Sequence, residues 1–170
     1  MKKTTAVFTT IIGVVLMLGV ILWIGRPRGV RQPFANAGSA YLPAPLVAEE
    51  TSFDFGSISM ARGDVVKEFF LKNTGSEAIT IKKLYTSCMC TEATFVRGGE
   101  RTGPFGMPGH GFVPSLGEAV APGEEVVISV AFDPAAHGPA GIGRIERVVY
   151  AEGADGEQLF SLQIAATVTP

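Results

Sequence analysis

The chain has 170 residues, a length that suits one domain with accessory segments, and 46% of them are hydrophobic. Five of its 14 basic residues flank an apolar run near the N-terminus, so the rest of the chain carries nine basic and all 16 acidic residues, a net charge near −7. This sign opposes binding to phosphates, and no cluster of lysine and arginine with interleaved aromatic residues occurs, so the composition excludes a nucleic-acid-binding protein.

The N-terminal apolar run covers residues 6–25, AVFTTIIGVVLMLGVILWIG, and contains no charged side chain. About 20 residues at a helical rise of 1.5 Å span the roughly 30 Å hydrocarbon layer, so we expect a transmembrane helix after a short tail of residues 1–5. The run is longer than the core of a cleaved signal peptide, which favours an uncleaved signal anchor. Two lysines before it and three arginines after it nearly balance, so charge alone does not decide the topology.

Residues 26–48 mix proline, alanine, glycine and serine without periodicity, which is typical of a flexible linker. From residue 49 to residue 170 the apolar period is two, and no segment shows the 3.6-residue period of a helix. Together with a segment around the two cysteines, about seven short strands result, and we expect an all-β fold, an immunoglobulin-like antiparallel β-sandwich. The clearest predicted strands are residues 53–58, 65–73, 78–87, 126–132, 144–151 and 159–168.

The predicted strand 78–87 changes its apolar parity along its length. Ile79 and Ile81 share one face, whereas Leu84 and Thr86 fall on the other. A β-bulge near residues 82–83 would turn both sets of side chains toward the core, so we expect one there.

Residues 97–118, RGGERTGPFGMPGHGFVPSLGE, form an insertion dense in glycine and proline. A structureless loop of this length is uncommon in a compact domain and is usually either functional or flexible. If the insertion is functional, we expect Phe105, Met107 and Phe112 to be exposed and to contact a partner. We also expect that deleting most of the insertion would leave the fold intact.

Several motifs follow one another in a specific order: FDFGSI at 53–58, NTG at 73–75, TSCMCT at 86–91, and a Pro-Gly turn that leads to Phe-Asp-Pro at 132–134. This order resembles the bacterial domain-of-unknown-function family 1573, a relative of the immunoglobulin-like Hydin domains, over most of residues 50–168. Two features depart from the family pattern: Met89 replaces the usual glycine between the cysteines, and the insertion lengthens a normally short connection. The resemblance implies an exported or membrane-tethered domain, and it implies no specific function.

Cys88 and Cys90 are the two cysteines of the chain. On an extended strand their Cβ atoms would lie about 6–7 Å apart, whereas a disulfide needs about 3.8 Å. A disulfide between them would therefore be strained and would require a bend that Met89 allows less readily than glycine. Buried, inert thiols on the sandwich wall are one interpretation that stays open.

Two chemical interpretations of the pair also stay open. The thiolates, together with Met107 and His110 of the insertion, could bind copper(I), which prefers soft ligands. A redox-active dithiol is the other, although the sequence places few basic residues near it. His137 falls in an apparent turn, and we assign it to solvent.

No nucleophile motif, metalloprotease motif, P-loop or dinucleotide fingerprint occurs, so we expect no enzyme. The sequence thus predicts a single-pass membrane protein anchored by residues 6–25, with its β-sandwich outside the cytoplasmic membrane. We expect a non-catalytic binding or scaffolding module for an envelope protein, without a cofactor. The alternative is a copper-binding or thiol-redox protein that uses Cys88 and Cys90.

Overall fold

The computed structural model describes residues 45–170. The predicted tail (1–5), transmembrane helix (6–25) and nearly all of the linker (26–48) lie outside the described residues. Within residues 45–170, no helix has both the length and the apolar character needed to cross a bilayer.

The described part of the chain consists of strands and two short 3₁₀ helices. The strands are β1 (Leu46–Ala48), β2 (Ser52–Ser59), β3 (Val65–Asn73), β4 (Ile79–Ile81), β5 (Lys83–Thr86), β6 (Thr91–Arg97), β7 (Glu100–Phe105), β8 (Glu118–Val120), β9 (Glu125–Phe132), β10 (Gly143–Glu152) and β11 (Gln158–Thr169). The 3₁₀ helices are η1 (Met60–Arg62) and η2 (Gly138–Gly141). The predicted all-β class is confirmed, with more strands than the seven expected.

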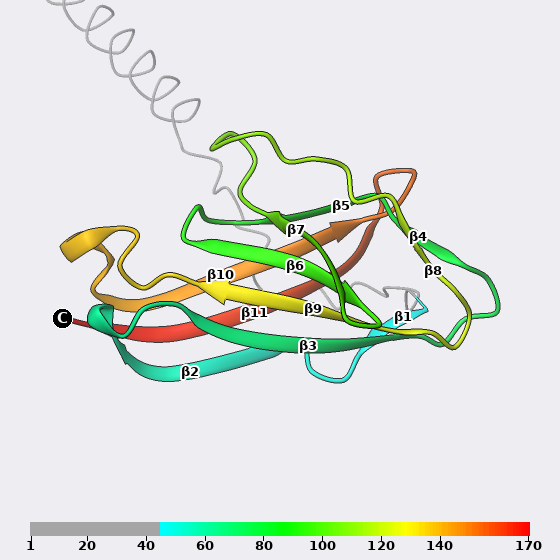
Figure 1. Ribbon diagram of the computed structural model, residues 1–170. Coiled ribbons are helices and arrows are strands. Elements are labelled where there is room, and N and C mark those ends of the chain that lie inside the picture. The colour runs from blue at the N-terminus through cyan, green and yellow to red at the C-terminus, as the bar shows by residue number, and fades with distance from the viewer. Residues whose placement is uncertain (1–44) are drawn as a thin grey trace, which may run out of the picture. The chain divides into compact units, whose positions relative to one another are not determined.

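Two sheets stack face to face, as Figure 1 shows. One sheet has five strands in the order β1-β3-β9-β6-β7, and the other has four in the order β2-β11-β10-β5. A two-stranded ribbon of β4 and β8 extends one end. All strand pairs are antiparallel except β2 with β11, which run parallel at the edge of the four-stranded sheet. The architecture is therefore the predicted β-sandwich.

The core forms from the residues that alternate along the long strands. On β9 the alternate apolar side chains that share one face are buried, and so are those on β11. Each fully buried valine, leucine, isoleucine or phenylalanine among them contributes roughly 1.5–3 kcal/mol to folding before conformational entropy is subtracted. These buried residues are Val126, Ile128, Val130 and Phe132 on β9, and Phe160, Leu162, Ile164, Ala166 and Val168 on β11.

The predicted strand 78–87 is two strands that belong to different sheets. β4 ends at Ile81 and pairs with β8, whereas β5 begins at Lys83 and pairs with β10. Between them, the backbone N–H of Lys82 donates to the carbonyl of Glu152. The prediction that both sets of apolar side chains turn toward the core is confirmed, because Ile81 and Leu84 are both buried. The expected bulge was wrong, because the chain changes sheets at this point.

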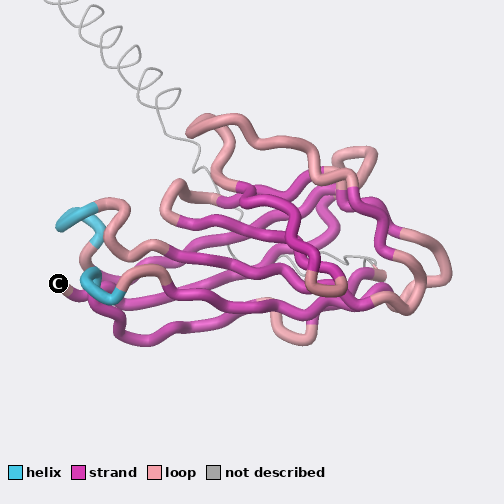
Figure 2. The backbone as a smooth tube through the Cα atoms, in the orientation of Figure 1, coloured by secondary structure: helices cyan, strands magenta, loops and turns pink. Residues whose placement is uncertain are grey.

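The glycine- and proline-rich insertion is also different from the prediction. It begins with a hairpin in which Gly98 (φ 56°) and Gly99 (φ 91°) form a two-residue turn between β6 and β7. Two successive residues with positive φ match the twist of the flanking strands, and glycine adopts this conformation without a steric penalty. The segment then passes along β5 as a loop and leads into β8, which begins at its last residue, Glu118 (Figure 2).

Phe105, at the end of β7, is 1% exposed and belongs to the core, so the prediction that it lies on the surface was wrong. Phe112 is 92% exposed, as expected, and Met107 is half-buried. The alternating pattern of β7 is weak because a single aromatic side chain reaches the core from six residues. A deletion of the insertion would remove an edge strand and this aromatic anchor.

Candidate functional site

Cys88 and Cys90 lie in the turn that joins β5 of the four-stranded sheet to β6 of the five-stranded sheet. The N–H of Thr91 donates to the carbonyl of Cys88 at 3.1 Å, which closes the turn. Ser87 anchors it to β10 through backbone and side-chain hydrogen bonds to Val148, both 2.9 Å long. The prediction that the two cysteines lie on an extended strand was therefore wrong.

The turn changes the geometry of the two thiols. The sulfur atoms of Cys88 and Cys90 lie 2.7 Å apart, and both cysteines are free. Cys90 is 3% exposed, Cys88 is half-buried, and Met89 between them is 50% exposed. The backbone bends between the two cysteines although Met89, rather than glycine, stands there. The bend is needed because the chain crosses from one sheet to the other within a few residues.

His137 reaches the pair from the loop that follows β9. This loop is tied to the cysteine turn, since the N–H of Asp133 donates to the carbonyl of Cys90 at 2.9 Å. The carboxylate of Asp133 in turn accepts from the N–H of Ala135 at 2.7 Å. These contacts place His137 Nε2 3.1 Å from Cys88 Sγ, although the ring also touches solvent. Its assignment to a solvated turn missed this contact, because 49 residues separate the two side chains.

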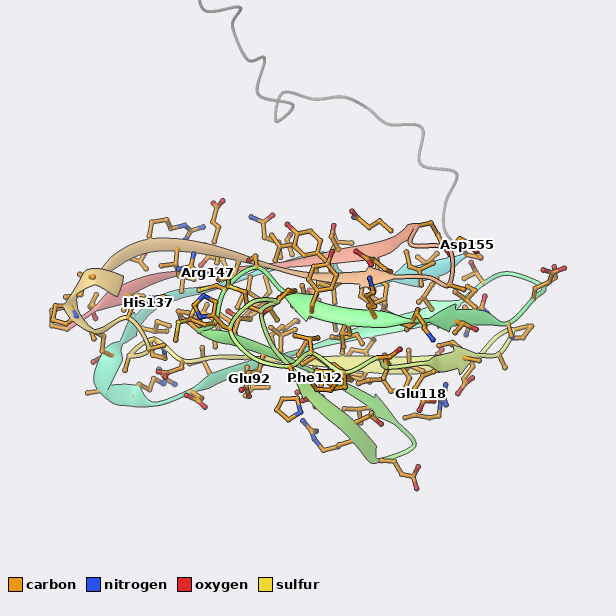
Figure 3. All side chains as sticks on the ribbon, turned by 90° about the horizontal axis from the view of Figure 1, so that it is seen from above. Glu92, Phe112, Glu118, His137, Arg147 and Asp155 are labelled. Carbon is orange, nitrogen blue, oxygen red and sulfur yellow. The ribbon has the colours of Figure 1, made fainter. Side chains whose placement is uncertain are left out.

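Arg147 reaches the pair from β10. Its Nε–H donates to Cys90 Sγ at 3.2 Å, and its Nη1 donates to the carbonyl of Glu146. Figure 3 shows Arg147 and His137 at the same end of the sandwich. One sequence signal could have identified Arg147: it has the same parity as Ile145 and Val149, which are buried, and a charged residue in an inward-facing position usually has a partner.

The surroundings affect the two thiols in opposite directions. Burial opposes ionisation of Cys88, but hydrogen bonds from Cys90 and His137 and the charge of Arg147 outweigh it and lower the Cys88 pKa to about 7. Burial and the neighbouring Cys88 raise the pKa of Cys90. The more exposed sulfur is thus the one whose thiolate is better stabilised.

A cavity of about 180 Å³ borders Cys90 and Met89, and its other walls include the carboxylates of Asp64, Glu92 and Asp133. The cysteine turn therefore lies between an acidic side and the side of Arg147 and His137.

Cys88, Cys90 and His137 bring one ligand atom each to within 4.8 Å of one another, which would suit a metal ion. His110 of the predicted ligand set is exposed and does not belong to this group. Met107 follows Gly106, whose carbonyl accepts a hydrogen bond from the N–H of Thr86. The structure thus assembles the predicted cysteines with a different histidine from the one expected.

The family described as "Protein of unknown function (DUF1573)" matches residues 46–102, about a third of the chain, including both cysteines. This match supports the family resemblance in that region. No curated protein matches the sequence.

Among solved structures, a protein of unknown function from Porphyromonas gingivalis W83 has 16% identity and a TM-score of 0.51, and the match covers 72% of this chain and 46% of that one. At this identity the likeness shows the fold alone, and the chain spans less than half of that protein. The Vibrio cholerae VesB protease (16% identity, TM-score 0.46, 72% and 32% covered) and PapD-like domain 7 of human CEP192 (12%, 0.43, 75% and 87%) are more distant in structure and carry no argument.

Proposed function

We propose that this protein is a membrane-anchored thiol–disulfide exchange module whose reacting groups are Cys88 and Cys90. The observation that carries the proposal is the 2.7 Å separation of the two sulfur atoms in a turn held by both sheets. A disulfide has a sulfur–sulfur bond of about 2.05 Å, so closing the pair requires a movement of less than about 1 Å. The turn therefore removes the geometric objection that an extended strand would raise.

The difference in burial assigns the two roles. Cys88 is the accessible sulfur and attacks a disulfide of the partner, forming a mixed disulfide and releasing one partner thiolate. Buried Cys90 then attacks Cys88 Sγ, which closes the Cys88–Cys90 disulfide and releases the second partner thiolate. The partner disulfide gains two electrons, the protein dithiol loses two, and the reverse sequence oxidises a partner dithiol.

His137 and Arg147 support these roles through their contacts. A thiolate is the nucleophile in exchange, and neighbouring cationic or hydrogen-bonding groups stabilise it. His137 lies 3.1 Å from Cys88 Sγ and can exchange a proton with that sulfur or with solvent. The guanidinium of Arg147 donates to Cys90 Sγ, so the buried sulfur also has a cationic partner when it carries charge.

The proposed location is the outer face of a cytoplasmic membrane. The charge-free run of residues 6–25 is long enough to anchor the chain, and the linker of residues 26–48 would hold the sandwich near the bilayer. Disulfides form and persist in compartments outside the cytoplasm, which suits an exchange pair in an exported domain.

The test is to trap the mixed disulfide in the full chain, purified in mild detergent. A Cys90→Ser variant, with no resolving thiol, should accumulate a mixed disulfide with a small reporter disulfide such as oxidised glutathione. The matched Cys88→Ser variant, which retains only the buried Cys90, should react at least tenfold more slowly. Because the chain has two cysteines, mass spectrometry assigns each adduct without ambiguity. Equal rates for the two variants, or no disulfide in wild-type protein after incubation with the reporter, would contradict the proposal.

A second candidate, a binding or scaffolding module for an envelope protein, is favoured by one observation. Phe112 of the insertion is 92% exposed, and a large aromatic side chain with this exposure suits a partner contact. The deletion considered from the sequence would remove β7, so the sharper test is Phe112→Ser. Loss of partner co-purification with unchanged thermal unfolding would support a partner contact at Phe112, and unchanged co-purification would contradict it.

A further inference from the structure

We propose that the reduced Cys88, Cys90 and His137 form a three-coordinate site for a single copper(I) ion. This site goes beyond thiol exchange and does not depend on it. It keeps the two predicted cysteines but replaces the predicted ligands Met107 and His110 by a histidine from the loop after β9.

The types of ligand in the site favour copper(I). The two sulfurs and the imidazole nitrogen lie within 4.8 Å of one another, with no carboxylate in the group. Thiolate and imidazole ligands suit copper(I), whereas calcium and magnesium require oxygen. A structural zinc site has four protein ligands, and within residues 45–170 no fourth side chain joins this group; a zinc ion bound here would need a water molecule in the fourth position.

The charge of the site favours a monovalent ion. Two thiolates with copper(I) and a neutral histidine carry a net charge of −1, and the guanidinium of Arg147 beside Cys90 Sγ balances it. The same ligands with a divalent ion would be neutral and would not balance the guanidinium, so the charge of Arg147 favours a monovalent ion at this site.

The position of the ligands is largely fixed before the ion arrives. A hydrogen bond from the N–H of Asp133 to the carbonyl of Cys90 ties the histidine loop to the cysteine turn, and Gly138 (φ 54°) turns the chain directly after His137. With metal–sulfur bonds near 2.3 Å, two ligand sulfurs lie about 4 Å apart, so the pair must open by roughly 1 Å. Rotation of the half-buried Cys88 side chain provides this opening on the side that His137 and solvent share.

The experiment is a titration of the full chain in mild detergent with copper(I) itself, under reducing and anaerobic conditions, in competition with a chromophoric copper(I) chelator. Wild-type protein should take up one equivalent. His137→Ala should bind at least tenfold more weakly, because losing a direct ligand costs no less than the 10–100-fold typical of an outer contact. His110→Ala is the matched control, since it removes the other histidine of the described residues, and its affinity should be unchanged.

The histidine variants would overturn the proposal in either of two ways: equal affinities of the His137→Ala variant and wild type, or a loss in His110→Ala as large as that in His137→Ala. Cys88→Ser/Cys90→Ser should take up no copper, and uptake equal to wild type would also overturn it. Because that double variant alters a buried residue, the comparison of the two exposed histidines decides the matter independently of folding. Glutathione trapping in the Cys90→Ser variant is a separate measurement. A negative copper titration therefore does not contradict thiol exchange, and a negative trapping result does not contradict the copper site.

Discussion

The burial of Phe105 gives the sharpest quantitative prediction, because the same insertion carries an exposed phenylalanine as its control. Phe105 is 1% exposed and packs in the core, whereas Phe112 is 92% exposed. Replacing a buried phenylalanine by alanine removes its transfer free energy and leaves a cavity, which together cost about 3–5 kcal/mol. Replacing an exposed one changes stability by less than about 0.5 kcal/mol.

The assay is urea unfolding of the full chain in mild detergent, followed by the β-sheet circular dichroism signal. With a slope near 2 kcal/mol per molar urea, Phe105→Ala should lower the midpoint by about 1.5–2.5 M. Phe112→Ala should leave the midpoint within about 0.3 M of wild type. If Phe105→Ala unfolded within 0.5 M of wild type, or both variants lost the same amount, the insertion would not be part of the fold and the reasoning would fail.

Asn73, Gly103 and Tyr85 each give a further prediction. Asn73→Ala removes a fully buried side chain that makes three hydrogen bonds to the backbone, so it should lower the free energy of unfolding by at least about 2 kcal/mol, measured by the same urea titration. Gly103→Ala should cost about 1–3 kcal/mol in that assay, because a Cβ atom there would lie 3.0 Å from the Phe105 ring at a φ of +128°; a neutral result would contradict this packing. Burial and the hydrogen bond to Glu152 raise the pKa of Tyr85 to about 12. In the unfolded chain this tyrosine ionises near pH 10, before it does in the folded protein. The stability that its raised pKa contributes is therefore complete below about pH 10 and is lost as the pH rises toward 12. Ultraviolet titration should show a midpoint near 12 that falls in Glu152→Gln, and an unchanged midpoint would refute the assigned cause.

Much of the sandwich could be predicted from the sequence because strand formation leaves a local periodic record. The inward residues of β9 and β11 follow from two-residue alternation alone, and the structure buries each of them. Alternation did not predict the structure of the insertion, because the two glycines of its hairpin turn are equally typical of a flexible loop. Phe105 does not belong to an alternating apolar pattern. Nothing in the local sequence therefore indicated that it is buried at the edge of the sheet.

The site was predicted in part. Its two cysteines were identified from their spacing, but their mutual distance was not, because a pair that spans a turn between two sheets has a different geometry from a pair on one strand. His137 and Arg147 lie 49 and 57 residues from the cysteines they contact. No local pattern encodes such contacts, although an arginine at an inward position of β10 was a usable signal.

The sequence by itself determined the position of the long strands β2, β3, β9, β10 and β11 and, on β9 and β11, which side chains share a face, since both depend on neighbouring residues and on the fixed alternation of an extended backbone. The tertiary structure alone decided that a turn, a loop and a strand from distant parts of the chain meet around two sulfur atoms. That meeting depends on how the sheets stack and where the chain crosses between them, and these are properties of the whole packed domain.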